Sequence, residues 1–277
     1  MNTRIKQASI DLMSRDHFQD VNRLDKILGK QESASLSNMV PPNPFVGNPS
    51  KLIPGECVAL IGINPRLDIN RKGFQEFEIN IPRQCQAKYA RTGNLSAFDP
   101  WFEKLHNFYH SDAYYGRYFT KLGNHIGRAW FTSPIEGEPA HVNARKVLSN
   151  HVLKLDAVPY YSETDNMAPE HVSAAMRNDP AMLSHHNLIE TLIEECKPRH
   201  LQVNGKNTAG EMIKTVFGER GSFEIIGDGN SSIEAGWAKI GNHELPILIH
   251  GFTNSPNGPQ SPVAFQSCVD SFEMWKH

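Results

Sequence analysis

Two kinds of hydrophobic pattern alternate along the chain. Within 1–35, apolar residues recur every three or four positions, as in Ile5, Ala8 and Leu12, which predicts one or two amphipathic helices. Short unbroken apolar runs, each followed by a turn-forming segment, occur at 57–62, 152–158, 200–204 and 245–250. Such runs are typical of strands that are buried on both faces of a parallel sheet.

Helical patterns separate these predicted strands, at 101–128, 184–197 and 206–217. A last helix is expected to begin at Ser261 and Pro262, an N-cap residue followed by proline at the first helical position. The alternation predicts an α/β fold with three layers, α/β/α, around a central four-stranded, mostly parallel sheet. The segment 222–240 predicts an extra hairpin that is foreign to a plain βαβ repeat.

The first fifty residues differ from the rest. Segment 36–55 contains five prolines and predicts an extended crossing rather than a helix or strand. We therefore divide the chain into an N-terminal helical extension with a Pro-rich crossing, 1–50, and an α/β domain, 51–277. One domain fits better than two, with the N-terminal helices packed onto it as an accessory layer.

Composition restricts the classes of function. No apolar run reaches the roughly 20 residues that span a bilayer, and charges interrupt the first twenty residues, so we expect a cytoplasmic protein without a membrane partner. The four cysteines form no C-x2-C pair, and we predict neither a metal site nor a cofactor. The net charge is −2, so binding to nucleic acid would need a local basic patch. Segment 64–91 offers one, with six Lys or Arg against three acids.

Polar residues follow the predicted strands. Ligands of open parallel sheets bind at the carboxyl ends of the strands. Those ends carry Asn64, Asp156, Asn204 with Lys206, and His250. Each alone suits a turn or cap. Together they predict a site on one edge of the sheet.

These segments resemble the uracil-DNA glycosylase superfamily. GINPRLDINRKG (62–73) is similar to the first motif of its mismatch-specific uracil/thymine-DNA glycosylase branch, and LQVNGKNTAGEMIKTVFG (201–218) to the strand–helix segment of that branch. KLDAVPYYS (154–162) falls where the family has a strand ending in its base-reading Asn. ILIHGFTNSPNG (247–258) falls where the family has its last strand and DNA-inserting loop, which begins with a catalytic His in several branches.

Several residues depart from the pattern of that branch, and these departures change which substrate we expect. Arg66 stands where the nearest branch has Gly, and Asp156 where it has Asn. His250 is present although that branch lacks a His there. The chain thus looks like a divergent member whose substrate cannot be carried over.

The resemblance implies two catalytic residues. Asn64 is expected to hold the attacking water, and His250 to donate to the base O2 as negative charge grows there. The structural alternatives are an amide that only closes its turn and a core histidine bonded to backbone.

Other residues would bind the flipped base and the DNA. Phe74 or Phe77 would stack on the base, next to Ile63 and Asp156. Phe252 would fill the vacated stack as a wedge. The expected DNA-binding residues are Arg66, Lys72, Lys206, Phe252, Thr253, Asn254 and Ser255. The alternatives are core packing for the Phe residues and solvated surface charge for the basic ones.

Asp156 suggests the substrate. A carboxylate accepts from the N4–H2 of cytosine but repels the O4 of uracil. In an apolar pocket its pKa rises, and it could then protonate N3. We expect a monofunctional glycosylase for a modified cytosine in double- or single-stranded DNA, with anti-phage defence as one setting. The alternatives are a repair glycosylase for uracil or mismatched thymine, and a non-catalytic sensor of modified DNA.

Overall fold

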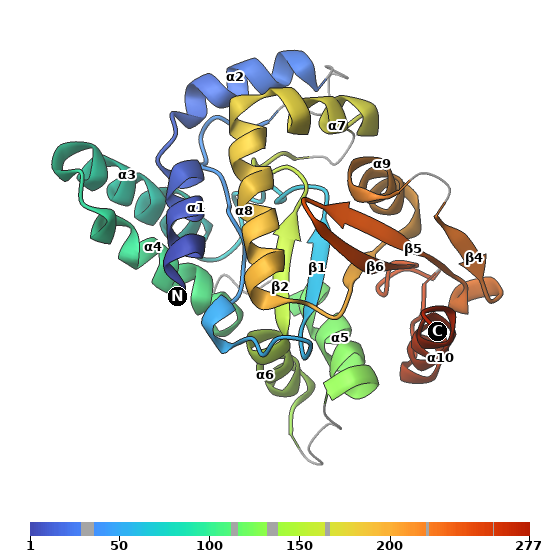
Figure 1. Ribbon diagram of the computed structural model, residues 1–277. Coiled ribbons are helices and arrows are strands. Elements are labelled where there is room, and N and C mark those ends of the chain that lie inside the picture. Colours follow the sequence, from blue (N-terminus) through green and yellow to red (C-terminus); the bar gives the residue numbers. More distant parts are fainter. Residues whose placement is uncertain (29–35, 112–115, 132–137, 164–166, 220–221, 257) are drawn as a thin grey trace.

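A six-stranded sheet forms the centre of the molecule (Figure 1). The computed structural model describes residues 1–28, 36–111, 116–131, 138–163, 167–219, 222–256 and 258–277. Within them the strand order is β2-β1-β3-β6-β5-β4. The strands are β1 (Val58–Gly62), β2 (Val152–Asp156), β3 (Leu201–Asn204), β4 (Glu224–Ile226), β5 (Ile233–Ile240) and β6 (His243–His250).

The sheet is mixed, which corrects the prediction of a four-stranded sheet. Neighbours along β2-β1-β3-β6 pair in parallel, while β5 and β4 are antiparallel. The α/β class and the predicted strand positions are confirmed. The predicted hairpin is not an appendage, because β5 pairs with β6 along its whole length. Between them lies a tight turn at Gly241, whose φ of +59° suits glycine.

One face of the sheet packs against α1 (Thr3–Met13) and α8 (Pro180–Cys196), which lie side by side (Figure 1). Ala59 and Ile61 of β1 point into this core. Side chains from α2, α3, α4, α7 and α9 join it. Their bounds are α2 (His17–Ile27), α3 (Ile81–Thr92), α4 (Asp99–His106), α7 (Pro169–Asn178) and α9 (Glu211–Phe217).

The opposite face carries α5 (Gly116–Ile126), α6 (Ala140–His151) and α10 (Pro262–Trp275). Leu60 of β1 points into this second core, as expected from the alternation of side chains along a strand. Helix α10 begins as predicted, since Ser261 Oγ accepts from the N–H of Ala264 at 3.1 Å. Short 3-10 or π segments are Pro49–Lys51, Gln75–Asn80, Leu95–Phe98, Phe108–His110, Gly127–Phe131, Lys206–Gly210 and Gly229–Ser231.

The N-terminal helices share the main core rather than forming one of their own. Buried Asp20 of α2 accepts from Arg15 at 2.7 Å and from the Tyr160 hydroxyl at 3.0 Å. Arg23 bridges Asp20 to Asp179, the N-cap of α8. These contacts attach α2 to the loop after β2. Across the described ranges, no helix has the length and apolarity needed to cross a membrane.

Candidate functional site

Four residues at the carboxyl ends of the parallel strands lie side by side. Gly62 is in register with Asp156, and Asn204 with His250. Leu60 pairs with Gln202, so the same register brings Gly62 next to Asn204. We call Asp156, Gly62, Asn204 and His250 the strand-end row. Neighbouring members are about 4.8 Å apart and point to the face that α5 and α10 cover.

Gly62 leaves room in the middle of the row. A Cβ there would lie 2.8 Å from Asp156 Oδ1 and 3.3 Å from Lys154 Nζ. Both side chains therefore lean over Gly62, toward Asn204. Any larger residue at position 62 would push them aside. The absence of a side chain on Gly62 thus makes room for the Asp156–Lys154 ion pair, which fills this part of the row.

Asp156 is buried at 4% exposure and forms an ion pair with Lys154. Burial raises the pKa of its carboxyl, and the Lys154 ammonium opposes that shift. The direction of this shift favours the protonated carboxyl. Lys154 was not among the predicted site residues. The sequence feature that could have identified it is its position two residues before Asp156, which places both on the same face of the strand.

The amide of Asn204 is oriented by the loop after β6. Its Oδ1 accepts from the backbone N–H of Thr253 at 3.0 Å, which fixes which end of the amide is oxygen. Its buried Nδ2 makes no well-formed hydrogen bond in the described part of the chain. A buried donor left without a partner costs about 1–3 kcal/mol. The sequence placed Asn204 at a strand end without assigning it a role.

Tyr118 of α5 faces this end of the sheet. Burial raises the pKa of its hydroxyl to about 12; the Asn204 amide lowers it and the Asp156 carboxylate raises it. The hydroxyl is therefore close to both groups. Its ring lies 5.9 Å from that of Phe252, which is 37% exposed. Sequence reasoning missed Tyr118 because nothing distinguished it within the helical stretch 101–128.

His250 is fully buried and both ring nitrogens have partners. Gln202 Nε2 donates to its Nε2 at 2.8 Å, and its Nδ1–H donates to the carbonyl of Gly251 at 2.9 Å. Burial lowers its pKa to about 4, so the ring is neutral. It packs edge-on against Phe265. To contact a base, this ring would have to exchange its bond with Gln202, so the catalytic role of His250 stays a prediction.

Asn64 lies in the loop beyond β1. Its Nδ2 donates to Ser162 Oγ at 2.7 Å and to the carbonyl of Tyr160 at 3.3 Å, which ties this loop to the loop after β2. Its Oδ1 accepts no hydrogen bond from a described residue. The amide thus closes its turn and keeps one acceptor for a water molecule. Both interpretations of Asn64 fit this geometry.

The predicted stacking residues lie inside the protein. Phe74 is 1% exposed and meets Tyr161 edge-on at 6.0 Å, and Ile63 is 5% exposed. Phe77 is half-buried against the second core. Of the aromatic rings near the strand-end row, Tyr118 and Phe252 form the pair that reaches the surface. Whether any of these residues binds a base stays a prediction.

The predicted DNA-binding residues differ in exposure. Arg66, Lys72, Phe252 and Asn254 are exposed, Ser255 is half-buried, and Thr253 is buried. Lys206 is half-buried and donates to Ser232 Oγ.

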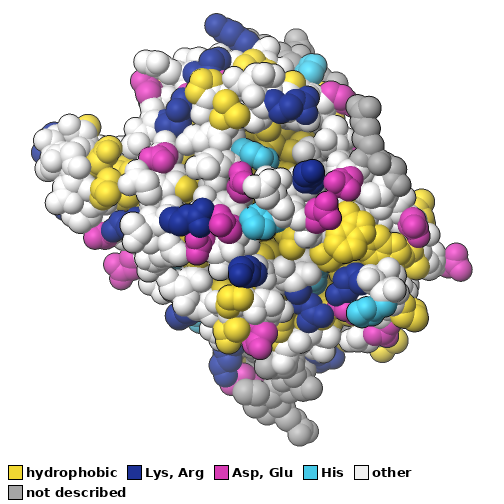
Figure 2. Space-filling view, viewed as in Figure 1, with side chains coloured by type: hydrophobic (Ala, Val, Ile, Leu, Met, Phe, Trp, Pro, Cys, Tyr) yellow, Lys and Arg dark blue, Asp and Glu magenta, His cyan; other side chains and the backbone are white. Residues whose placement is uncertain are grey.

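Part of the basic segment 64–91 is used internally. Arg71 pairs with buried Glu78 at 2.8 Å, and Arg83 donates to the carbonyl of Met39. On the face shown in Figure 2, basic and acidic side chains are interspersed rather than gathered in a stripe. A DNA contact on this face would therefore rely on a few local residues.

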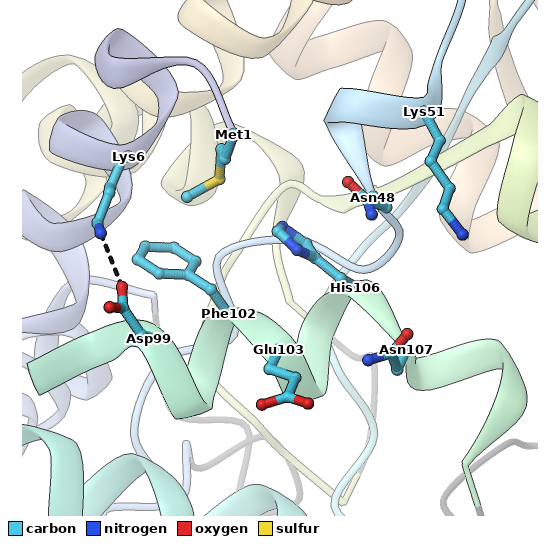
Figure 3. Close-up of a pocket in the computed structure, with 9 residues that line it drawn as sticks. All are labelled: Met1, Lys6, Asn48, Lys51, Asp99, Phe102, Glu103, His106 and Asn107. Atoms are coloured by element: carbon cyan, nitrogen blue, oxygen red, sulfur yellow. Dashed lines mark hydrogen bonds and ion pairs between the residues drawn. The ribbon is translucent and has the colours of Figure 1, made fainter. Parts of the chain in front are cut away.

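Two surface hollows lie away from the strand-end row. One, of about 480 Å³, is lined by α1, the segment before β1 and α4 (Figure 3). There Lys6 and Asp99 form an ion pair of 2.7 Å, and His106 lies beside Phe102. The other, of about 780 Å³, lies between α7 and α9. Neither is lined by a predicted site residue.

In the ranges that the structure describes, no three His, Cys, Asp or Glu side chains come together as metal ligands would. The resemblance to the glycosylases rests on the sequence motifs. A comparison of the sequence with protein-family models and with curated proteins finds no match to either.

Proposed function

We propose that the protein is a DNA glycosylase that excises a cytosine-type base, in the first place a modified cytosine, and leaves an abasic site. The observation that carries the proposal is the pair of buried polar groups on either side of Gly62 at the strand ends. One is the Asp156 carboxyl with its raised pKa, and the other is the Asn204 amide, whose Nδ2 has no hydrogen-bond partner among the described residues. Tyr118 and Phe252 supply aromatic surface beside them.

The chemistry requires a flipped nucleotide, because the glycosidic bond is inaccessible inside a duplex. Asp156 would accept from N4–H2 and, when protonated, give its proton to N3, which makes cytosine a better leaving group. The C1′–N1 bond then breaks and the base departs with the bonding electrons. Water, held by Asn64 Oδ1, adds its oxygen to C1′ and releases one proton. That proton restores the Asp156 carboxyl, so the reaction consumes one water.

A modified base is favoured because excision of ordinary cytosine would destroy the host genome. Defence against phages that carry modified cytosine is a setting that such an activity would serve. The partner is DNA, and no protein partner follows from the sequence.

The proposal is tested with matched duplexes and single strands that carry one uracil, cytosine, 5-hydroxymethylcytosine or glucosylated 5-hydroxymethylcytosine. Alkaline cleavage at abasic sites reports excision. We expect strand breaks with a modified cytosine. Breaks with uracil alone would favour a repair glycosylase. Salt-sensitive binding to modified DNA without breaks would favour a sensor.

Asn64→Ala is expected to lower single-turnover base release at least 100-fold while DNA affinity changes less than threefold. The reason is that Asn64 acts on water in the transition state and not on bound DNA. Asn70→Ala, an exposed residue of the same loop, is the control and should keep the wild-type rate. Unchanged release by Asn64→Ala, in protein that melts like the wild type, would exclude the role.

A further inference from the structure

The orientation of Asn204 determines what its free end can bind. Thr253 N–H occupies Oδ1, so the two hydrogens of Nδ2 point to the other side of the amide. Oδ1 of this residue is thus held by backbone, independently of any ligand. Asn204 is 7% exposed, so bulk water does not satisfy Nδ2. A fixed donor in this position calls for an acceptor on the ligand.

Two neighbours share this character. Thr253 is fully buried, and its Oγ1 also lacks a partner among the described residues. The Tyr118 hydroxyl has a raised pKa and therefore stays protonated, so it remains a donor at neutral pH. Two polar groups without a partner among the described residues, Asn204 Nδ2 and Thr253 Oγ1, thus lie at the end of β3 beside the Tyr118 hydroxyl. A built binding site accounts for this concentration better than core packing does, because each unpaired group costs stability.

We propose that Asn204 Nδ2, assisted by the Tyr118 hydroxyl, donates to the O2 atom of the departing base. The inference rests on the proposed glycosylase function. It assigns to Asn204 the role that the sequence assigned to His250. Both nitrogens of His250 are engaged, whereas Asn204 Nδ2 has the Tyr118 hydroxyl nearby but no well-formed hydrogen bond to a described residue.

The strand-end row supports this assignment geometrically. On the Watson–Crick edge of cytosine, N4 and N3 lie on one side and O2 on the other. Asp156 and Asn204 stand on either side of Gly62, which carries no side chain. The Asp156 and Lys154 side chains fill the space over Gly62 in this structure, so a base reaches the row only when they move aside. It would then present N4 and N3 to Asp156 and O2 to Asn204. The two residues then read opposite ends of one edge.

The proposed donor, Asn204 Nδ2, acts on the base atom where negative charge develops during the reaction. As the C1′–N1 bond breaks, its electron pair moves into the base and part of the negative charge collects on O2. A donor already oriented toward that oxygen stabilises the transition state more than the bound substrate. Removal of one such donor typically lowers a rate about 100- to 1,000-fold.

The test compares Asn204→Asp with the wild type. This variant keeps an oxygen for Thr253 N–H and replaces the donating NH2 by an oxygen. Asn204→Ala and Tyr118→Phe are the second and third variants, and Asn207→Ala, an exposed neighbour, is the control. Single-turnover release is measured on 5-hydroxymethylcytosine and on 5-formylcytosine, whose electron-withdrawing formyl group makes the base a better leaving group.

We expect about a 100-fold loss or more for Asn204→Asp and Asn204→Ala, and about tenfold for Tyr118→Phe. The losses should be smaller on 5-formylcytosine than on 5-hydroxymethylcytosine, because a better leaving group needs less stabilisation at O2. A purely structural role would lower all rates equally. Wild-type rates in Asn204→Asp, or equal losses on both bases, would overturn the inference while the glycosylase function stands. No release by the wild type from any substrate would overturn the proposed function itself.

Discussion

Asp156→Asn is expected to move base preference from cytosine-type bases toward uracil by tenfold to over 100-fold. The Asn amide accepts from N4–H2 but cannot protonate N3, so release of cytosine-type bases falls. The same amide donates to uracil O4, where a carboxylate would repel that oxygen. A mispaired buried contact costs about 1–3 kcal/mol, which sets the size of the change. Single-turnover rates of both proteins on matched oligonucleotides give the ratio.

The pH profile provides an independent check of the same residue. The pKa of Asp156 is raised above its ordinary value, and the protonated carboxyl is the active form. Activity should therefore be highest on the acid side and decline as the pH rises through this raised pKa. This decline in activity with rising pH should vanish in Asp156→Asn and persist in Asp228→Asn, an exposed control. Equal losses of Asp156→Asn on every base, with this decline retained, would contradict the role.

Mild acid is expected to unfold the protein, because several histidines are buried and neutral. Burial lowers the pKa of His125, His185 and His250 to about 4. His125 stacks on Phe265, and neither of its nitrogens has a partner among the described residues. Protonation of such a ring places an unpaired charge in the core.

The sign follows from proton linkage. The folded pKa lies below the unfolded value of about 6.5, so the unfolded state binds more protons. The stability that these neutral histidines contribute is therefore present above pH 6.5 and is lost as the pH falls toward 4. Each of these histidines contributes a loss of about 2 kcal/mol between pH 7 and pH 5. Three together approach the whole stability of a typical domain, about 5–15 kcal/mol.

Urea unfolding at pH 8, 7, 6 and 5 measures this effect through the transition midpoint. His125→Phe should keep the stacking on Phe265, unfold later than the wild type at pH 5 and differ less at pH 8. His171→Gln, an exposed control, should follow the wild type at every pH. An identical pH dependence of stability for wild type and His125→Phe would show that His125 does not contribute to the loss of stability in acid.

The strands were predictable because their apolar runs are local signals. The runs at 57–62 and 200–204 became β1 and β3 within one residue at each end. The width of the sheet was not predictable. Whether the hairpin adds to β6 depends on pairing across Gly241, a choice that only the register shows. Helices α6 and α7 were also missed, because their few apolar positions made no clear stripe in the sequence.

The site was predictable in outline. Asn64, Asp156, Asn204 and His250 do lie at the carboxyl ends of parallel strands, and the last three share one row. What each side chain contacts was not predictable. The pairing of His250 with Gln202 and the orientation of the Asn204 amide depend on rotamers and on the loop at Thr253. Lys154 and Tyr118 could be recognised as site residues only from the sheet register and from the packing of α5.

The identity of the released base shows whether the protein excises a modified cytosine. Wild-type protein and Asp156→Asn are each incubated with single- and double-stranded oligonucleotides that carry uracil, cytosine or a modified cytosine. Free bases are then identified by mass spectrometry. The glycosylase account predicts that the wild type releases an intact modified cytosine and leaves an abasic site, and that Asp156→Asn releases far less of it. Release of uracil in preference to every cytosine-type base by the wild type, or of no base at all, would contradict it.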